Sequence, residues 1–420
     1  MRALVVGSGA REHAIAWKLL QGGEAHEVYA APGNPGMAAI AHCVPIPADA
    51  IVELAEFAAS LKVDLTVVGP ELPLVQGITD EFQQRSLTVL GPTRAAAEIE
   101  GSKVFTKEFC QRHGIPTPAA RVVRTRDEAA RAARELGVPV VFKADGLAAG
   151  KGVNVCLTRD DVEQALVRFF DERAFGAAGE RVLVEECVTG DEVTFMVLTD
   201  GASTVPLASA RDFKRVNDGD LGPNTGGMGA FSPAPLPTEV ATAILRQIVQ
   251  PTLEGLAQEG RVFRGVLYAG VMLTADGPKL LEFNCRLGDP ETQVVLPRLD
   301  IDLFALFRAA AQGELAGARV AWRREAATCV VLAAAGYPEA PRRGDAITGI
   351  AEALALPGVV VFHAGTAIQD GRLVTAGGRV LSVVGRGATL DEATECAYGA
   401  VARIAFDGMH CRKDVGRLRE

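Results

Sequence analysis

The sequence predicts a multidomain protein of the α/β and α+β classes, with an open parallel sheet at its N-terminus. The 420 residues exceed one ordinary core, so two to four domains are expected. In residues 2–90, short β-rich apolar runs alternate with helical patterns, which is typical of a parallel sheet with helices on both faces. After residue 325 the chain becomes β-rich, which indicates a separate C-terminal domain.

The first unit combines predicted strands and helices in alternation. Its strands are expected at 2–6, 27–31, 63–68 and 87–90, and its helices at 11–21, 50–61 and 76–85. The loops after these strands contain glycine and proline, and ligands collect at such carboxyl ends in open α/β sheets. A break near 98–101 precedes a helical pattern over 102–113, which ends at HGIPTP.

A smaller α/β unit is expected from 119 to about 190. Its predicted helices cover 127–136 and 159–170, between the strands RVVRT, PVVFKAD, VNVCL and RVLVEEC. Residues 210–237 are polar and glycine-rich without a helical or strand period, so no regular element is expected there. A helix over 238–258 and the strands VLYAGVMLT and KLLEFN follow. The C-terminal unit contains TCVVLAAAG, VVVFHAG and GRVLSVVG as strands and a closing helix near 390–405.

Composition and charge argue against several classes of protein. No apolar run approaches the ~18 residues of a membrane span, and the N-terminus lacks an export pattern, so a cytoplasmic protein is expected. The formal net charge of −9 argues against general binding to nucleic acid or anionic membranes, but leaves a local basic pocket open. The eight cysteines form no CxxC pair and the six histidines no metal-ligand spacing, which favours reduced thiols over disulfides or zinc.

The segment GSGAREH begins like a dinucleotide-binding loop but fails two tests for one. Glu12 occupies the position of the third glycine, and the second strand ends without the acidic residue that would hold a ribose. The small residues and the helix N-terminus after them still suit a phosphate, and Arg11 adds a positive charge. A phosphate cradle is therefore expected, with a tight turn that binds no ligand as the alternative.

The segment VVFKADGLAAGKGV predicts a glycine-rich hairpin that closes over phosphates. It is not a Walker loop, because only three residues separate Gly146 from Gly150, and Gly152 stands where Ser or Thr would bind magnesium. In a strand–loop–strand hairpin, glycines let backbone N–H groups approach phosphates. The chain has only nine lysines, so Lys143 on the strand and Lys151 at the tip favour this interpretation over a hairpin without a ligand.

The segment VLVEECVTGDEV ends a strand in acidic residues. Glu185 and Glu186 are adjacent, so they cannot both face the core, and Glu192 follows after a turn. These side chains could accept hydrogen bonds from an adenine amino group or ribose hydroxyls. Solvated residues at a sheet edge are an equal alternative.

The segment LLEFNCRLGDPETQ carries the strongest local signal for a site. Glu282 and Asn284 are two residues apart on a strand, so they share one face and offer hard oxygen ligands to Mg²⁺. Phe283 faces the opposite side and is expected to pack. Arg286 is expected within reach of a substrate bound to the metal, and its planar guanidinium group suits a phosphoryl or carboxylate oxygen.

A lysine-bearing hairpin, an acidic strand and a Glu-x-Asn pair, in this order, resemble the ATP-grasp ligases. The blocks GSGAREHA, VGPELPLVQG, EGSKVFTK, KADGLAAGKGV, GPNTGGMGAFSPAP and EFNCRLGDPETQ resemble, more narrowly, the phosphoribosylamine–glycine ligase family, over essentially the whole chain. The resemblance implies an N-terminal substrate-binding domain (1–101) and an ATP-grasp core (102–324) with a lid subdomain at about 119–190. A β-rich C-terminal domain (325–420) would follow.

The resemblance implies that ATP drives ligation of glycine to 5-phosphoribosylamine, the second step of de novo purine synthesis. The γ-phosphoryl group would first convert glycine to glycyl phosphate, which the amine then attacks, giving N1-(5-phosphoribosyl)glycinamide, ADP and phosphate. The implied cofactor is Mg²⁺ or Mn²⁺, with ATP as co-substrate, and the partners are small molecules. A monomer is expected, and a transient contact with the preceding enzyme of the pathway is left open.

Two alternatives stay open at this point. The first is another ATP-grasp carboxylase or ligase of purine synthesis, one that uses bicarbonate or formate. The NTGGMGA block argues against it, because the resemblance ties that block to the glycine ligase family. The second is a nucleotide-binding regulator that has lost catalysis. The intact residues that argue against it are Glu282, Asn284, Arg286 and Lys151.

The resemblance also implies roles for individual residues. The residues expected to bind ATP are Lys103, Lys143, Gly150, Lys151, Gly152, Glu185, Glu186, Cys187, Val188 and Glu192. The residues expected to hold the metal are Glu282 and Asn284, and the catalytic residues are Arg286, Lys143 and Lys151. The residues expected to bind glycine and phosphoribosylamine are Gly9, Arg11, Asp212, Lys214, Asn224, Thr225, Gly226, Gly227, Arg286 and Asp289.

The chain departs from the family pattern at two places. Ala10 stands where a second loop glycine is common, and Arg211 and Phe213 change the block QDHK to RDFK. Asp212 and Lys214 persist, so the same chemistry is expected. The glycines of TAGGRV (375–380) could contact substrate or only form a tight turn.

Overall fold

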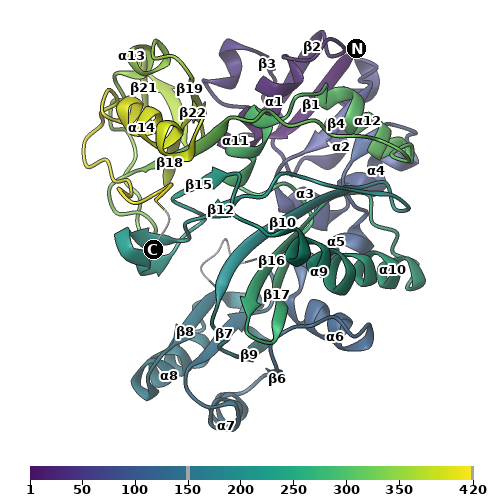
Figure 1. The fold of residues 1–420 in the computed structure, drawn as a ribbon, viewed down its shortest axis with the longest axis vertical. Coiled ribbons are helices and arrows are strands. Elements are labelled where there is room, and N and C mark those ends of the chain that lie inside the picture. Colours follow the sequence, from purple (N-terminus) through teal and green to yellow (C-terminus); the bar gives the residue numbers. More distant parts are fainter. Residues whose placement is uncertain (148–151, 418–420) are drawn as a thin grey trace.

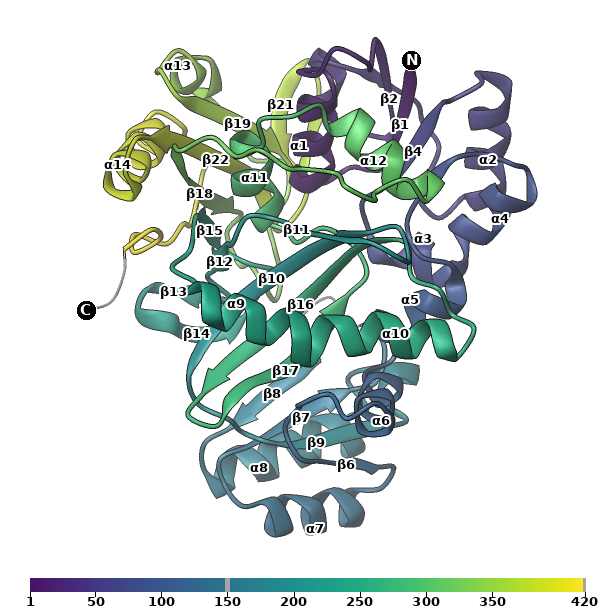
Figure 2. The same cartoon turned by 45° about the vertical axis from the view of Figure 1, so that its right-hand side comes forward.

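The computed structural model describes residues 1–147 and 152–417. Figures 1 and 2 show the N-terminal sheet and the C-terminal sheet side by side at one end of the molecule, and the lid subdomain at the opposite end. A central antiparallel sheet lies between them. Among the described residues, no helix combines the length and hydropathy of a membrane span. All eight cysteines are free thiols.

The N-terminal sheet is parallel, as predicted, with the order β3-β2-β1-β4-β5. Its strands are β1 (Arg2–Gly7), β2 (Glu27–Pro32), β3 (His42–Cys43), β4 (Leu65–Val68) and β5 (Val89–Leu90). Its helices are α1 (Ala10–Leu19), α2 (Ile51–Ser60), α3 (Glu71–Gln76), α4 (Ile78–Gln84) and α5 (Arg94–Gly101). The helix predicted over 76–85 is confirmed as α4. The preceding helix α3 was not predicted, and Gly77, with a left-handed φ of 98°, separates the two. The strand order reverses between β1 and β4, and such switch points collect ligands.

The lid subdomain contains an antiparallel sheet with the order β6-β9-β7-β8. Its strands are β6 (Ala120–Val123), β7 (Val140–Ala144), β8 (Val153–Cys156) and β9 (Val182–Glu186). The helix α6 (Lys103–Arg112) precedes it. The helices α7 (Arg126–Leu136) and α8 (Arg159–Leu166) follow Thr125 and Thr158, whose side chains cap their N-termini. Both helices pack on one face of the sheet, which leaves the other face for polar side chains.

The central sheet is also antiparallel, with the order β11-β10-β16-β17. Its strands are β10 (Asp191–Thr199), β11 (Thr204–Pro206), β16 (Gly265–Thr274) and β17 (Gly277–Asn284). The helices α9 (Thr238–Ile244) and α10 (Gln250–Gln258) are joined by a π-helical turn over Leu245–Val249. Together they run across this sheet, as Figure 2 shows, and confirm the helix expected over 238–258.

The C-terminal sheet has the order β12-β15-β18-β22-β19. Its strands are β12 (Arg211–Asp212), β15 (Gly229–Ser232), β18 (Ala326–Ala333), β19 (Val359–His363) and β22 (Arg379–Gly387). Beside it lie the hairpin of β20 (Thr366–Gln369) and β21 (Arg372–Thr375) and the helices α11 (Glu291–Val295), α13 (Ile350–Leu354) and α14 (Leu390–Val401). The helix α12 (Leu303–Gln312) instead packs against α1 and β5.

The prediction that residues 210–237 lack regular structure is wrong. They contain β12, β15 and a hairpin of β13 (Arg215–Asn217) and β14 (Leu221–Asn224). Every residue of β15 is buried, so this strand shows no alternation of polar and apolar residues. β15 pairs with β18, so the C-terminal sheet includes strands that precede residue 325.

Candidate active site

Two lysines converge on one buried carboxylate on the open face of the lid sheet. Nζ of Lys143 lies 2.5 Å from Oε2 of Glu185, and Nζ of Lys107 lies 2.7 Å from Oε1 of the same side chain. Lys107 reaches this point from α6 and also donates to the hydroxyl of Thr117. Burial opposes ionisation of Glu185, but the two lysines outweigh it and lower its pKa. Glu185, an expected ATP ligand, therefore acts in this structure as the anchor of Lys143.

Lys103 lies at the base of the glycine-rich hairpin. Its Nζ donates to the carbonyl oxygen of Gly146 at 2.9 Å, and burial is the main cause that lowers its pKa. The N–H of Ala144 donates to the carbonyl oxygen of Gly152, which closes the predicted strand–loop–strand hairpin. Gly150 and Lys151 lie outside the described residues.

The expected adenine segment begins at Glu186, the last residue of β9. Glu186, Cys187 and Val188 are all partly exposed there. Oε2 of Glu186 accepts the N–H of Ala119 at 3.3 Å and lies 3.9 Å from Nζ of Lys279. In the register of β7 and β9, Glu185 pairs with Val141 and so shares the face of Lys143, whereas Glu186 pairs with Val140 and lies on the opposite face.

The expected metal ligands share one face of β17. Glu282 and Asn284 flank Phe283, which is buried in the core as predicted. Burial opposes ionisation of Glu282, but Lys214, Lys143, Lys103 and Arg286 outweigh it and lower its pKa. No group of three or more His, Cys, Asp or Glu side chains in the described part of the chain could hold a metal ion. Two protein oxygens nevertheless fit Mg²⁺, which commonly takes its other ligands from water and substrate phosphates.

Two carboxylates that the sequence analysis missed hold Arg286: Glu100 is buried and Glu71 is half-buried. Its Nη2 lies 3.0 Å from Oε1 of Glu100, and its Nε lies 3.4 Å from Oε2 of Glu71. Nη2 also donates to Oδ1 of Asn284 at 3.2 Å. Burial opposes the charge of Arg286, yet Glu100 and Glu71 outweigh it and raise its pKa. Both residues could have been proposed as site residues from the sequence, because Glu71 and Glu100 belong to the blocks VGPELPLVQG and EGSKVFTK that resemble the family.

The carboxylate of Glu12 forms a hydrogen bond and an ion pair within the expected phosphate cradle. Its Oε2 accepts the N–H of Gly9 at 2.6 Å, so Glu12 occupies this donor of the expected cradle in this structure. Nε of Arg11 lies 2.7 Å from Oε1 of Glu12, and Nη1 of Arg11 donates to the carbonyl oxygen of Leu287. A Cβ at Gly69 would lie 2.1 Å from Oε1 of Glu12, so this carboxylate fills the crevice between the loops after β1 and β4.

Lys214 lies among acidic side chains in the expected substrate pocket. It is hydrogen bonded to Glu192, the expected ribose ligand, and lies 3.8 Å from Glu282. Burial raises the pKa of Asp212 to about 8; Lys214 opposes this shift, and the nearby carboxylates of Glu291, Glu192 and Glu282 add to it.

The loop after β14 attaches to Lys214 through its backbone. The N–H and the hydroxyl of Thr225 both donate to the carbonyl oxygen of Lys214, at 2.8 Å and 2.9 Å. Asn224 ends β14, and Gly226 and Gly227 follow toward Asp289. Arg379, the first residue of β22, donates to the carbonyl oxygen of Gly226 in this loop. It also donates to the carboxylate of Asp289. Arg379 was also missed, because only the glycines of TAGGRV were considered.

Phe213, one of the residues that differ from the family pattern, packs in the interior of the protein. Its ring is buried, 4.7 Å from the guanidinium carbon of Arg412 and 6.2 Å from the ring of Phe231. Arg412 is completely buried and pairs with Asp220 and Asp414. The C-terminal RKDVG segment thereby anchors the hairpin that precedes the substrate loop.

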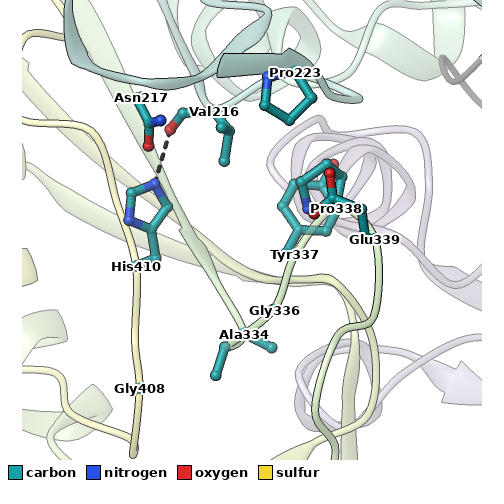
Figure 3. Close-up of a pocket in the computed structure, with 11 residues that line it drawn as sticks. Val216, Asn217, Pro223, Ala334, Gly336, Tyr337, Pro338, Glu339, Gly408 and His410 are labelled. Carbon is teal, nitrogen blue, oxygen red and sulfur yellow. Dashed lines mark hydrogen bonds between the residues drawn. The ribbon is translucent and has the colours of Figure 1, made fainter. Parts of the chain in front are cut away.

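A cavity of about 440 Å³ lies beside the β13–β14 hairpin. Figure 3 shows Tyr337 and Pro338 on one side of it, and His410 on another with its ring bonded to the carbonyl oxygen of Val216. None of the described residues that line this cavity is a predicted site residue. The candidate site is therefore defined by the convergence of charged groups, not by this cavity.

Three family models match the chain in succession. The phosphoribosylglycinamide synthetase N domain matches residues 1–100, its ATP-grasp (A) domain residues 101–292 and its C domain residues 327–418. The chain belongs to the phosphoribosylglycinamide synthetase family. The predicted family, fold class and ligase class are confirmed.

Individual members of the phosphoribosylglycinamide synthetase family are similar over their full length. The phosphoribosylamine–glycine ligases of Mesorhizobium japonicum and Ralstonia nicotianae are each 49% identical over 99% of this chain, which covers 98% and 99% of those proteins. The crystal structure of the Thermotoga maritima phosphoribosylamine–glycine ligase is 36% identical with a TM-score of 0.84, over 99% of this chain and 100% of that one.

Proposed function

We propose that this chain uses ATP to ligate glycine to 5-phosphoribosylamine, releasing ADP and phosphate and forming N1-(5-phosphoribosyl)glycinamide. The observation that carries the proposal is Arg286 beside Asn284, with Glu282 on the same strand face and Lys103, Lys143 and Lys214 close enough to lower the pKa of Glu282. Phosphoryl transfer depends mainly on positioning and charge neutralisation, and this cluster supplies both.

ATP binds, in this proposal, between the lid sheet and the central sheet. Lys103 and Lys143 neutralise its phosphates, together with Lys151, and Glu185 keeps Lys143 oriented. Glu282 and Asn284 would hold Mg²⁺ or Mn²⁺, which when bound neutralises charge on the phosphates. The backbone of residues 186–188 contacts the adenine, and Glu192 contacts the ribose once Lys214 releases it.

In this proposal, glycine and phosphoribosylamine bind on the side of Arg286 that faces away from the ATP site. The carboxylate oxygen of glycine attacks the γ-phosphorus of ATP, and ADP leaves. The amine of phosphoribosylamine then attacks the carbonyl carbon of glycyl phosphate, loses a proton, and phosphate leaves. Arg286 steadies the transferring group because Glu71 and Glu100 fix its guanidinium. The loop at Gly9 and Arg11 binds the phosphate of phosphoribosylamine, and Asp212, Lys214, Asp289 and residues 224–227 line the pocket.

A coupled assay with phosphoribosylamine generated in situ tests the proposal. ADP release should require glycine, phosphoribosylamine and Mg²⁺ together. Equal ADP release with formate or bicarbonate in place of glycine would instead favour another ATP-grasp ligase or carboxylase. ATP binding without any ADP release under these conditions would favour a regulator. The proposal includes a monomer in the cytoplasm, and light scattering tests its oligomeric state.

A further inference from the structure

Arg379 joins three segments that are distant in the sequence. It begins β22, and its Nη1 donates to the carbonyl oxygens of Gly226 at 2.5 Å and of Asp289 at 3.0 Å. Its Nη2 lies 3.0 Å from Oδ2 of Asp289. One partly buried guanidinium of the C-terminal sheet therefore connects the loop after β14 with the loop before α11.

The C-terminal domain holds Gly226 from both sides of its peptide backbone. While Arg379 bonds its carbonyl oxygen, the hydroxyl of Tyr337 accepts its N–H at 3.0 Å. A Cβ at Gly226 would lie 3.0 Å from Cζ of Arg379, and a Cβ at Gly227 would lie 2.4 Å from Cδ of Pro290. Close packing against Arg379 therefore explains Gly226, whereas Gly227 is explained by its contact with Pro290 and its left-handed φ of 108°. We define Arg379 and Tyr337 as the clamp.

The clamp also holds the side chain of Asp289 next to the loop that follows β1. Gln293 donates to Oδ1 of Asp289 at 2.7 Å, so Arg379 and Gln293 bond its two carboxylate oxygens. Burial opposes ionisation of Asp289, but Arg379, then Arg11, outweigh it and lower its pKa. A Cβ at Gly9 would lie 3.9 Å from Oδ2 of Asp289, which places this carboxylate beside the loop after β1.

We propose that Arg379 is a positioning residue for the glycine and phosphoribosylamine pocket, with Tyr337 as its second arm. The C-terminal domain thereby completes a pocket whose other walls come from the rest of the chain. An arginine is needed here because its planar guanidinium group donates in fixed directions to two carbonyl oxygens and a carboxylate. The ammonium group of a lysine could make only some of these bonds. This inference rests on the proposed function of the same site.

The test compares Arg379→Ala, Arg379→Lys and Tyr337→Phe with Arg386→Ala as the matched control. Arg386 lies on the same strand and pairs with Glu325 at 3.5 Å, outside the clamp. Arg379→Ala should raise the KM for glycine, phosphoribosylamine or both by about tenfold to a hundredfold, because a pocket shifted by about 1 Å loses that much. The KM for ATP should stay within about twofold, since the clamp bonds none of the predicted ATP ligands that the structure describes.

The conservative variants separate positioning from folding. Arg379→Lys should recover part of the loss, and Tyr337→Phe should raise the same KM values about threefold, by losing one hydrogen bond. Unchanged KM values in Arg379→Ala, or an equal rise in the KM for ATP, would overturn the inference. If Arg379→Ala does not fold, wild-type KM values in the other two variants overturn it. A wild-type enzyme that releases ADP without glycine would instead overturn the proposed function.

Discussion

Nζ of Lys143 lies 2.5 Å from Oε2 of Glu185, on the face of the lid sheet opposite its helices. The same carboxylate binds Lys107, so a residue outside the predicted site determines the direction of a predicted phosphate ligand. An ion network of this kind is sensitive to the loss of any one member, because the remaining charges stay buried.

Lys107→Met should therefore lower both stability and ATP affinity. Removing one partner of a buried pair costs about 3–5 kcal/mol, so the midpoint of urea unfolding should fall clearly. The KM for ATP should rise, because Glu185 loses one of the two bonds that hold it against Lys143. Lys62→Met, at an exposed lysine, is the control and should behave as wild type. A stable Lys107→Met enzyme with normal KM for ATP would contradict the role of this network.

Glu282→Gln should weaken the response to metal. The amide keeps the shape but loses the charge that Mg²⁺ prefers. The magnesium concentration for half-maximal turnover should rise by about tenfold or more. Asp276→Asn, in the turn of the same β-hairpin, is the matched control. A wild-type magnesium titration of Glu282→Gln would remove this residue from the proposed site.

Arg11→Ala should raise the KM for phosphoribosylamine and leave the KM for ATP unchanged. Arg11 lies beside Glu12 and the carbonyl oxygen of Leu287, next to Asp289 and away from the lysines of the lid. Arg85→Ala, at a surface ion pair on α4, is the control. Steady-state kinetics with each substrate varied in turn measure the effect. An equal rise in both KM values would place Arg11 in general folding instead of substrate binding.

His13 should make stability depend on pH between about 6.5 and 3. Its Nδ1 accepts the N–H of His363 at 2.9 Å, which joins α1 to β19. Burial lowers the pKa of His13 to about 3 and that of His363 to about 4. The unfolded chain, with ordinary histidine pKa values, therefore takes up protons first as the pH falls, and stability decreases.

Urea unfolding at pH 7 and pH 5 checks this prediction. The wild-type protein should lose about 2 kcal/mol per buried histidine at pH 5. His13→Asn keeps a hydrogen-bond acceptor but does not titrate, so its loss should be smaller by about that amount. His42→Asn, at an exposed histidine, should keep the wild-type dependence. Identical pH dependence in His13→Asn and wild type would contradict the assignment.

Local patterns predicted much of the fold and part of the site. The parallel N-terminal sheet, the lid hairpin and the shared face of Glu282 and Asn284 follow from periodicity within a few residues. The strands β12 and β15 could not be predicted in this way. β15 is buried throughout and pairs with a strand about 100 residues away, so its own residues carry no alternation.

The sequence by itself determined the family, most of the elements of the N-terminal and lid units, and the short motifs that carry the chemistry. It did so because each motif is contiguous, and its side chains are placed by the strand or loop that contains it. Only the tertiary structure decided that Glu71 and Glu100 hold Arg286, that Lys107 anchors Glu185, and that Arg379 closes the substrate loop. These partners come from separate elements, and burial requires that each charge finds a partner wherever packing places one.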